Sequence, residues 1–228
     1  MSTETETYDP TDRRPIASRE RKVWQKLAAF LAAHHVSPNS ISVAGMVVGI
    51  IAGILFVATG FMDTDSLQRA LFLGAAAGIQ IRLLANMLDG MVAIASQRAS
   101  RLGELYNELP DRVSDVAIII GAGYAAGGMP ILGYVAACVA ILTAYVRAVG
   151  KAAGVPNLFV GPMAKPHRMF VLTVVAVFTA LLPQHWQPSW GSLHAGFASI
   201  GLGVIIVGGL LTIFRRLALI VRHLQAPS

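Results

Sequence analysis

The chain has 228 residues, of which 55% are hydrophobic and only 13% are charged. A soluble domain of this length carries roughly twice that charged share. Together with a mean hydropathy of +0.62, the composition argues against a soluble protein and favours a membrane protein. The net charge of +6 would suit nucleic acid, but the basic residues stand in short clusters between apolar runs. That placement fits membrane topology better, so we expect no nucleic-acid partner.

The beginning of the chain is polar and then becomes amphipathic. Residues 1–17 have no apolar period, and we expect a flexible cytosolic tail without a signal peptide. Over residues 18–36, Val23, Leu27 and Phe30 recur at helical spacing opposite basic side chains. This pattern is typical of a juxtamembrane helix that lies on the lipid bilayer. A cytosolic helix that binds a partner protein is the alternative.

The third predicted region, residues 37–228, is a transmembrane domain. Six apolar stretches are near or above the ~20 residues that a helix needs to cross a bilayer. They cover about 41–60, 68–95, 108–127, 130–152, 166–184 and 196–221. The predicted fold class is therefore all-α, a polytopic membrane protein with six transmembrane helices and an N-terminal amphipathic surface helix. The single cysteine, Cys138, lies in an apolar run and forms no disulfide within the chain.

Basic residues cluster in alternate connections of this predicted topology. They precede the first span, separate the second from the third and the fourth from the fifth, and follow the sixth. By the positive-inside rule these segments and both termini face the cytosol. We therefore expect an integral protein of the cell (inner) membrane, with Trp186 and Trp190 at the outer interface.

Two of the predicted helices carry polar stripes where they meet the cytosol. The first stripe consists of Arg82, Asn86, Asp89 and Ala93, and the second of Asn107, Asp111 and Asp115. Steps of three and four residues place each stripe on one helical face, and we expect the two stripes to face each other. Carboxylates buried in a membrane need cations or hydrogen-bond donors. A functional site is therefore the default interpretation of this stretch.

The same stretch resembles the signature of the CDP-alcohol phosphotransferase family, D-x2-D-G-x2-A-R-x8-G-x3-D-x3-D. Every spacing is kept, and the matching positions are Asn86, Asp89, Gly90, Ala93, Ile94, Gly103, Asn107 and Asp111. Asparagines replace the first and third aspartates of the signature, and Ile94 replaces its arginine. The segments PNSIS at 38–42 and DRVSD at 111–115 also look like the family.

The resemblance implies a metal-dependent transferase of phospholipid synthesis. Such an enzyme moves a phosphatidyl group from a CDP-alcohol to the hydroxyl of an alcohol phosphate and releases CMP. Because the site opens at bilayer depth, the expected donor is CDP-diacylglycerol. The implied ligands of Mg²⁺ or Mn²⁺ are Asn86, Asp89, Asn107 and Asp111, with Asp111 as a ligand or as the base that takes the acceptor proton. The implied nucleotide-binding residues are Gly90, Ala93, Arg98 and Gly103. We also expect a homodimer.

The two asparagines leave several outcomes open. In the signature, four aspartates balance two divalent ions, whereas here two of the four carboxylates are missing. Asparagine still ligates through its carbonyl oxygen. Three outcomes are therefore open. One metal ion is enough for catalysis, a second ion binds together with the pyrophosphate of the donor, or the protein has lost catalysis. The alternative function is therefore a family member that binds a nucleotide-lipid or acts as a membrane scaffold. A small transporter is a weaker rival, because the chain has no inverted repeat.

Basic residues near the predicted site each have two interpretations. Four of them surround the connection between the fourth and fifth spans, namely Arg147, Lys151, Lys165 and Arg168. They bind the anionic acceptor or contact lipid headgroups. Arg98 either replaces the signature arginine from one turn later or holds the helix at the interface. Arg82 forms an ion pair with Asp89 or Asp115, or it contacts a phosphate.

Overall fold

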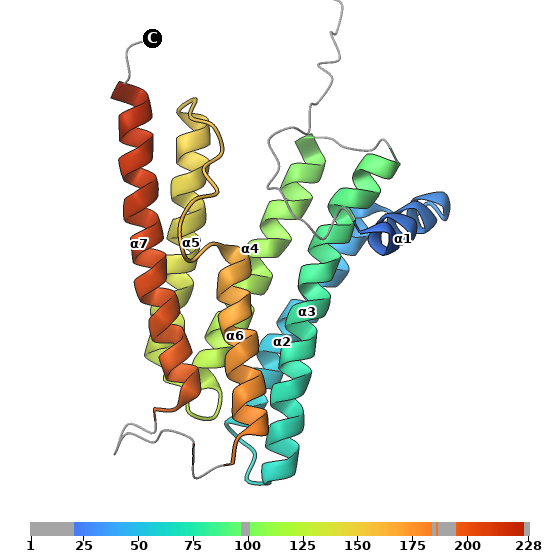
Figure 1. Cartoon of the computed structure of the whole chain (residues 1–228). Helices are drawn as coiled ribbons and strands as arrows, with labels where there is room; N and C mark the ends of the chain where they lie inside the picture. Colours follow the sequence, from blue (N-terminus) through green and yellow to red (C-terminus); the bar gives the residue numbers. More distant parts are fainter. Residues whose placement is uncertain (1–20, 97–100, 184–185, 187–194, 226–228) are drawn as a thin grey trace, which may run out of the picture.

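A bundle of α-helices makes up the described part of the protein. The structure is a computed structural model that describes residues 21–96, 101–183, 186 and 195–225, without the side chains of residues 101, 102 and 104. The helices are α1 (Lys22–Ala33), α2 (Pro38–Thr59), α3 (Asp65–Ala95), α4 (Arg101–Tyr124), α5 (Pro130–Ala152), α6 (Lys165–Leu181) and α7 (Phe197–Gln225). Helices α2 to α7 stand side by side, whereas α1 lies across one end of the bundle (Figure 1).

Four of the described helices, α2, α3, α5 and α7, are long and apolar enough to cross a membrane. The third and fifth predicted spans correspond to α4 and α6. Helix α4 has many polar residues in its first half, and α6 has only 17 residues. By length and composition alone, neither helix therefore qualifies as a membrane span. Both nevertheless stand within the bundle (Figure 1). The protein is thus an all-helical membrane protein, which confirms the coarse fold class predicted from the sequence.

Helix boundaries differ modestly from the predicted ones. Helix α4 begins at Arg101 rather than near residue 108, because its charged first turns continue the helix beyond the apolar stretch. The predicted surface helix over 18–36 is represented by α1, in which Val23 is 68% exposed and Phe30 57% exposed. Apolar side chains left uncovered by the bundle are expected of a helix that lies on a membrane. The predicted tail, 1–17, lies outside the described residues.

Helix α2 packs against α4 with almost no space between their backbones. A Cβ on Gly49 would lie 2.6 Å from the Ser114 Cβ, and one on Gly53 would lie 2.5 Å from the Ala117 carbonyl oxygen. Glycine is therefore needed at both positions, as at other close helix crossings in membranes. This contact holds the beginning of α2 beside the polar stripes of α3 and α4.

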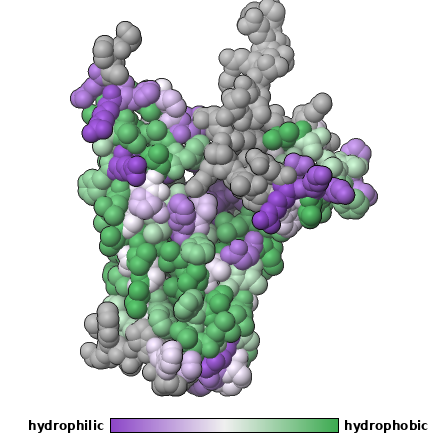
Figure 2. Space-filling view, in the orientation of Figure 1, coloured by the Kyte–Doolittle hydropathy of each residue, from purple (hydrophilic) through white to green (hydrophobic). Residues whose placement is uncertain are grey.

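Apolar and polar residues occupy different parts of the bundle along its length. Its core contains Phe56, Phe72, Ile79 and Ile118, all fully buried. Figure 2 shows hydrophobic residues over much of the bundle wall, with hydrophilic ones concentrated near its two ends. Most of the buried charged residues gather toward the end where α1 lies, on α3, α4 and the beginning of α6, and one more, Arg216, is on α7. The candidate site is at that end.

Candidate active site

The polar stripes of α3 and α4 face each other, as predicted from their spacing. The Asn86 amide of α3 donates to Asp111 Oδ2 of α4 at 3.1 Å. In the opposite sense, the Asn107 amide of α4 donates to both carboxylate oxygens of Asp89 on α3, at 3.3 Å each. Each of these two carboxylates therefore receives an asparagine from the other helix. Both asparagines belong to the site, although they depart from the signature.

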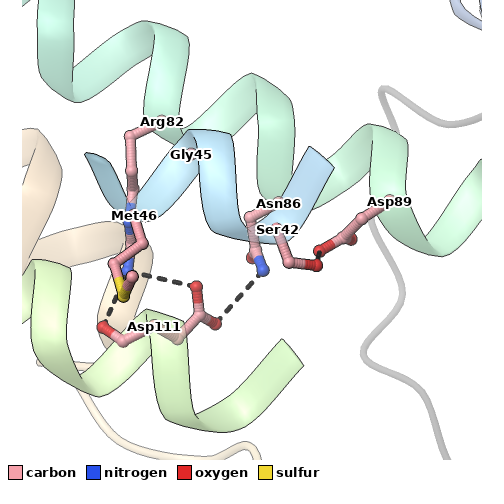
Figure 3. Close-up of a pocket in the computed structure, with 7 residues that line it drawn as sticks. All are labelled: Ser42, Gly45, Met46, Arg82, Asn86, Asp89 and Asp111. Carbon is pink, nitrogen blue, oxygen red and sulfur yellow. Dashed lines mark hydrogen bonds and ion pairs between the residues drawn. The ribbon is translucent and has the colours of Figure 1, made fainter. Parts of the chain in front are cut away.

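A small pocket opens between α2, α3 and α4 at this point (Figure 3). It is lined by Ser42, Gly45, Met46, Arg82, Asn86, Asp89 and Asp111. Ser42 donates its hydroxyl to Asp89 Oδ2 at 2.6 Å, a contact that the sequence analysis missed. The available signal was the PNSIS segment, whose last serine is Ser42.

Asp89 is a buried carboxylate whose donors in the described part of the chain are all neutral. It is 3% exposed, and its partners are the Ser42 hydroxyl, the Gly90 amide and the Asn107 amide. Within the described residues it pairs with no cationic side chain, and no three carboxylate, imidazole or thiol groups converge as a metal site. Oxygen ligands from carboxylates and amides suit Mg²⁺ and Mn²⁺. A buried anion without a cation is costly, so the surroundings of Asp89 fit one divalent ion.

Asp115 has the opposite surroundings. Its two oxygens accept from Arg82 at 2.6 Å and from Arg168 at 3.0 Å, and all three side chains are almost completely buried. Arg82 also donates to the Ser114 hydroxyl at 2.9 Å and pairs with Asp111 at 3.2 Å. Of the interpretations offered for Arg82, the ion pair with Asp115 is confirmed, and Asp89 is not its partner.

The four basic residues predicted to bind the acceptor do not form one open cluster. Arg168 is paired with Asp115, Lys165 with Asp111, and Arg147 with Glu108. Lys151, at the end of α5, is exposed. This arrangement corrects the expected convergence of free cations, because α4 supplies a carboxylate to three of the four. The acceptor-binding roles themselves stay predictions.

The residues predicted to bind the nucleotide lie around the connection from α3 to α4. Gly90 and Ala93 are in the last two turns of α3, and Gly103 is in the first turn of α4. Ile94, which replaces the signature arginine, is 53% exposed. Arg98 lies outside the described residues. The assignment of Gly90, Ala93, Arg98 and Gly103 to the nucleotide is a prediction that the described contacts leave open.

Comparison with known proteins identifies the family. No family model matches the sequence. A phosphatidylinositol phosphate synthase of Streptomyces avermitilis is 30% identical over 208 residues, which cover 89% of this chain and 79% of that protein. The chain belongs to the CDP-alcohol phosphotransferase family. The inner membrane protein YnbA of Escherichia coli is 28% identical over 171 residues, or 75% of this chain and 81% of that protein.

Solved structures share the fold of this family member. The phosphatidylinositol phosphate synthase PgsA1 of Mycobacterium tuberculosis with CDP-DAG bound has a TM-score of 0.70 at 18% identity, covering 88% of this chain and 94% of that one. The same enzyme in complex with manganese and citrate has a TM-score of 0.68 at 18% identity, with coverages of 86% and 88%. The likeness places the helices of this CDP-alcohol phosphotransferase in a known arrangement.

Proposed function

We propose that this protein transfers the phosphatidyl group of CDP-diacylglycerol to the hydroxyl of an alcohol phosphate and releases CMP. The observation that carries the proposal is a reciprocal pair of hydrogen bonds between α3 and α4. Asn86 of α3 donates to Asp111 of α4, and Asn107 of α4 donates to Asp89 of α3. These are four signature positions at the kept spacing. Relatives named phosphatidylinositol phosphate synthases support an inositol phosphate as the first acceptor to test. A related enzyme solved with CDP-DAG supports the donor.

The chemistry needs a positioned hydroxyl, a base and charge compensation on the pyrophosphate. The acceptor oxygen forms a bond to the phosphatidyl phosphorus while the bond from that phosphorus to the CMP oxygen breaks. Asp111 takes the hydroxyl proton, since it lines the pocket and its carboxylate is fixed by Arg82 and Asn86. A bound Mg²⁺ or Mn²⁺ supplies Lewis-acid stabilisation of the developing phosphate charge.

The candidates for metal ligands are the four motif residues Asn86, Asp89, Asn107 and Asp111, which offer carboxylate and amide oxygens. Asp89 is the strongest candidate, because its buried carboxylate has only neutral donors in the described structure. A homologous fold in complex with manganese supports the choice of ion. Gly90, Ala93, Gly103 and Arg98 are proposed to contact the nucleotide beside this ion.

Acceptor binding is best supported for the residues of α5. Lys151 is exposed, and Arg147 pairs with Glu108, whose side chain is 46% exposed, so both cations can reach an anion from the aqueous side. Arg168 is committed to Asp115 in the interior. Lys165 is half-buried against Asp111, where it contacts the reacting groups rather than the aqueous entrance.

The proposed topology has six membrane spans. Helices α4 and α6 cross the membrane beside α2, α3, α5 and α7, and α1 lies on the cytosolic surface. Side-by-side packing of all six supports it (Figure 1), as does the concentration of basic residues in alternate connections. Both termini and the site then face the cytosol. The named inner-membrane location of the E. coli relative supports the cell inner membrane. The boundaries at residues 17 and 36, and a homodimer, stay predictions.

The direct test is CMP release by purified protein in detergent with CDP-diacylglycerol and Mn²⁺. Parallel reactions contain inositol phosphate, glycerol phosphate, unphosphorylated inositol or no acceptor. We expect CMP and a new phospholipid only with a phosphorylated alcohol, and none after chelation of the metal. Binding of CDP-diacylglycerol without CMP release under any of these conditions would favour the alternative function, a lipid-binding or scaffold protein.

A further inference from the structure

Lys165 places an ammonium group among residues that the family signature reserves for metal ligands. It is the first residue of α6, yet its Nζ contacts Asp111 Oδ2 in a close ion pair and donates to Asn86 Oδ1 at 2.8 Å. Asn86 and Asp111 occupy the first and last acidic positions of the signature. The Lys165 side chain is 15% exposed and that of Asp111 11% exposed, so this cation sits inside the site.

The start of α6 is fixed by contacts on both sides of Lys165. The Met163 amide donates to Thr212 Oγ1 of α7 at 2.9 Å. Arg168 Nη1 donates to the Met163 carbonyl at 3.0 Å, and its Nη2 pairs with Asp115. These bonds tie the segment to α7 and to α4 at the same time. The ammonium is therefore held at Asn86 and Asp111 by the packing of three helices, and not by its own ion pair alone.

The two carboxylates of the motif thus differ in the cations available to them. Asp111 already forms ion pairs with Lys165 and Arg82, whereas Asp89 forms no ion pair with a cationic side chain in the described part of the chain. Asparagines at 86 and 107 leave Asp89 and Asp111 as the carboxylates of the four signature ligand positions. Two divalent ions would add four positive charges beside that ammonium. In a site of low dielectric, such an excess of like charge is strongly unfavourable.

We propose that the Lys165 ammonium occupies the place of one of the two metal ions of the family, so that this protein binds a single divalent ion, at Asp89 and Asn107. The inference deepens the proposed function, because it concerns the same site. Lys165 then supplies a fixed charge between Asn86 and Asp111, where the ammonium can meet the donor phosphates or the acceptor oxygen. The loss of the aspartate at position 86 follows, since an amide oxygen suffices to accept from an ammonium.

The test counts Mn²⁺ on the purified full chain in detergent, with and without CDP-diacylglycerol, by calorimetry and electron paramagnetic resonance. We expect one Mn²⁺ per chain and the spectrum of an isolated ion. Two ions about 3.5–4 Å apart, as in two-metal sites, would give a coupled spectrum. Two bound ions in the wild-type protein overturn the proposal, and so does the absence of any bound Mn²⁺ at millimolar concentration.

Variants then move the count in defined directions. Lys165→Met with Asn86→Asp removes the ammonium and restores a carboxylate, and we expect two Mn²⁺ ions and a coupled spectrum. Lys165→Arg keeps the charge and is expected to keep one ion. Asn86→Asp alone is also expected to keep one, because Lys165 still fills the position. A count of one in the folded double variant, or of two in Asn86→Asp alone, contradicts the proposal.

The ion count and the proposed function fail separately. CMP release together with two bound ions would refute the role of Lys165 and leave the transferase intact. One bound ion without CMP release would refute the transferase and leave the single-ion site standing. Thermal unfolding of each variant in the same detergent establishes that it is folded, and if the double variant is not, the wild-type and Asn86→Asp counts still decide.

Discussion

Two buried aspartates on different helices, Asp89 of α3 and Asp115 of α4, show how one residue type serves two purposes in this protein. Asp115 is enclosed by Arg82 and Arg168, with distances of 2.6 and 3.0 Å. Asp89 is equally buried, but it lines the pocket, and its donors among the described residues are hydroxyl and amide groups. A carboxylate whose charge is already compensated holds helices together. One whose charge is not compensated is available to a ligand.

Asp111 stands between these two extremes. It pairs with Arg82, as Asp115 does, and it accepts from an asparagine of the opposite helix, as Asp89 does. The polar stripe of α4 thus passes from a structural end at Asp115 to a reactive end at Asn107. This gradient means that substitutions of chemically similar residues should have different consequences, on stability at one end and on binding or catalysis at the other.

The largest effect on stability is expected for Asp115→Ala. Removing this carboxylate leaves Arg82 and Arg168 buried without their shared anion, which costs roughly 3–5 kcal/mol. Unfolding in detergent, followed by heat or denaturant, measures the loss. The control is Glu108→Ala on the same helix, where a 46%-exposed carboxylate also pairs with two arginines and its loss costs about 1 kcal/mol or less. Equal destabilisation by the two variants would remove the distinction between these regions.

Asp111→Asn is expected to abolish transfer while the protein stays folded. Loss of a general base lowers the rate by roughly 10²–10⁴-fold. The asparagine keeps the size of the side chain and still accepts through its carbonyl oxygen. CMP release measures the rate. Asp65→Asn, in an exposed pair with Arg69 at the other end of α3, serves as the matched control with unchanged turnover. Wild-type turnover of Asp111→Asn would exclude Asp111 as the base.

Asp89→Ala is expected to weaken Mn²⁺ binding at least tenfold, which corresponds to about 1.4 kcal/mol, without the destabilisation expected for Asp115→Ala. The reason is that no cationic side chain of the described residues pairs with Asp89, so removal of this carboxylate also removes a desolvation cost. Calorimetry of metal binding and thermal unfolding of the metal-free protein test both parts. Unchanged metal affinity would show that the ion binds elsewhere.

The smallest effect is expected at the entrance, for Lys151→Ala. An exposed cation contributes about 1 kcal/mol or less, so we expect the KM of a phosphorylated acceptor to rise by up to about fivefold, with the KM of CDP-diacylglycerol unchanged. Initial rates of CMP release at varied acceptor concentration test this. Equal changes in both KM values would identify Lys151 as a contact of the lipid surface.

The amino-acid sequence by itself determined the helical membrane class and the position of the site. Apolar length gives the spans, and steps of three and four residues place Asn86 with Asp89 and Asn107 with Asp111 on shared faces, because helical periodicity is a local property. The same argument predicted that these faces meet, and the structure confirms it through the Asn86–Asp111 and Asn107–Asp89 hydrogen bonds.

Only the tertiary structure decided which cation meets which carboxylate. Arg82 pairs with Asp115 rather than Asp89. Arg168, expected in the acceptor-binding cluster, is buried and also pairs with Asp115. Lys165, on another helix and far along the chain, reaches Asn86 and Asp111. Spacing along one helix cannot encode these choices, because ion pairing depends on how α6 packs against α3 and α4. Coulomb energy falls off with separation in space, and the fold alone sets that separation.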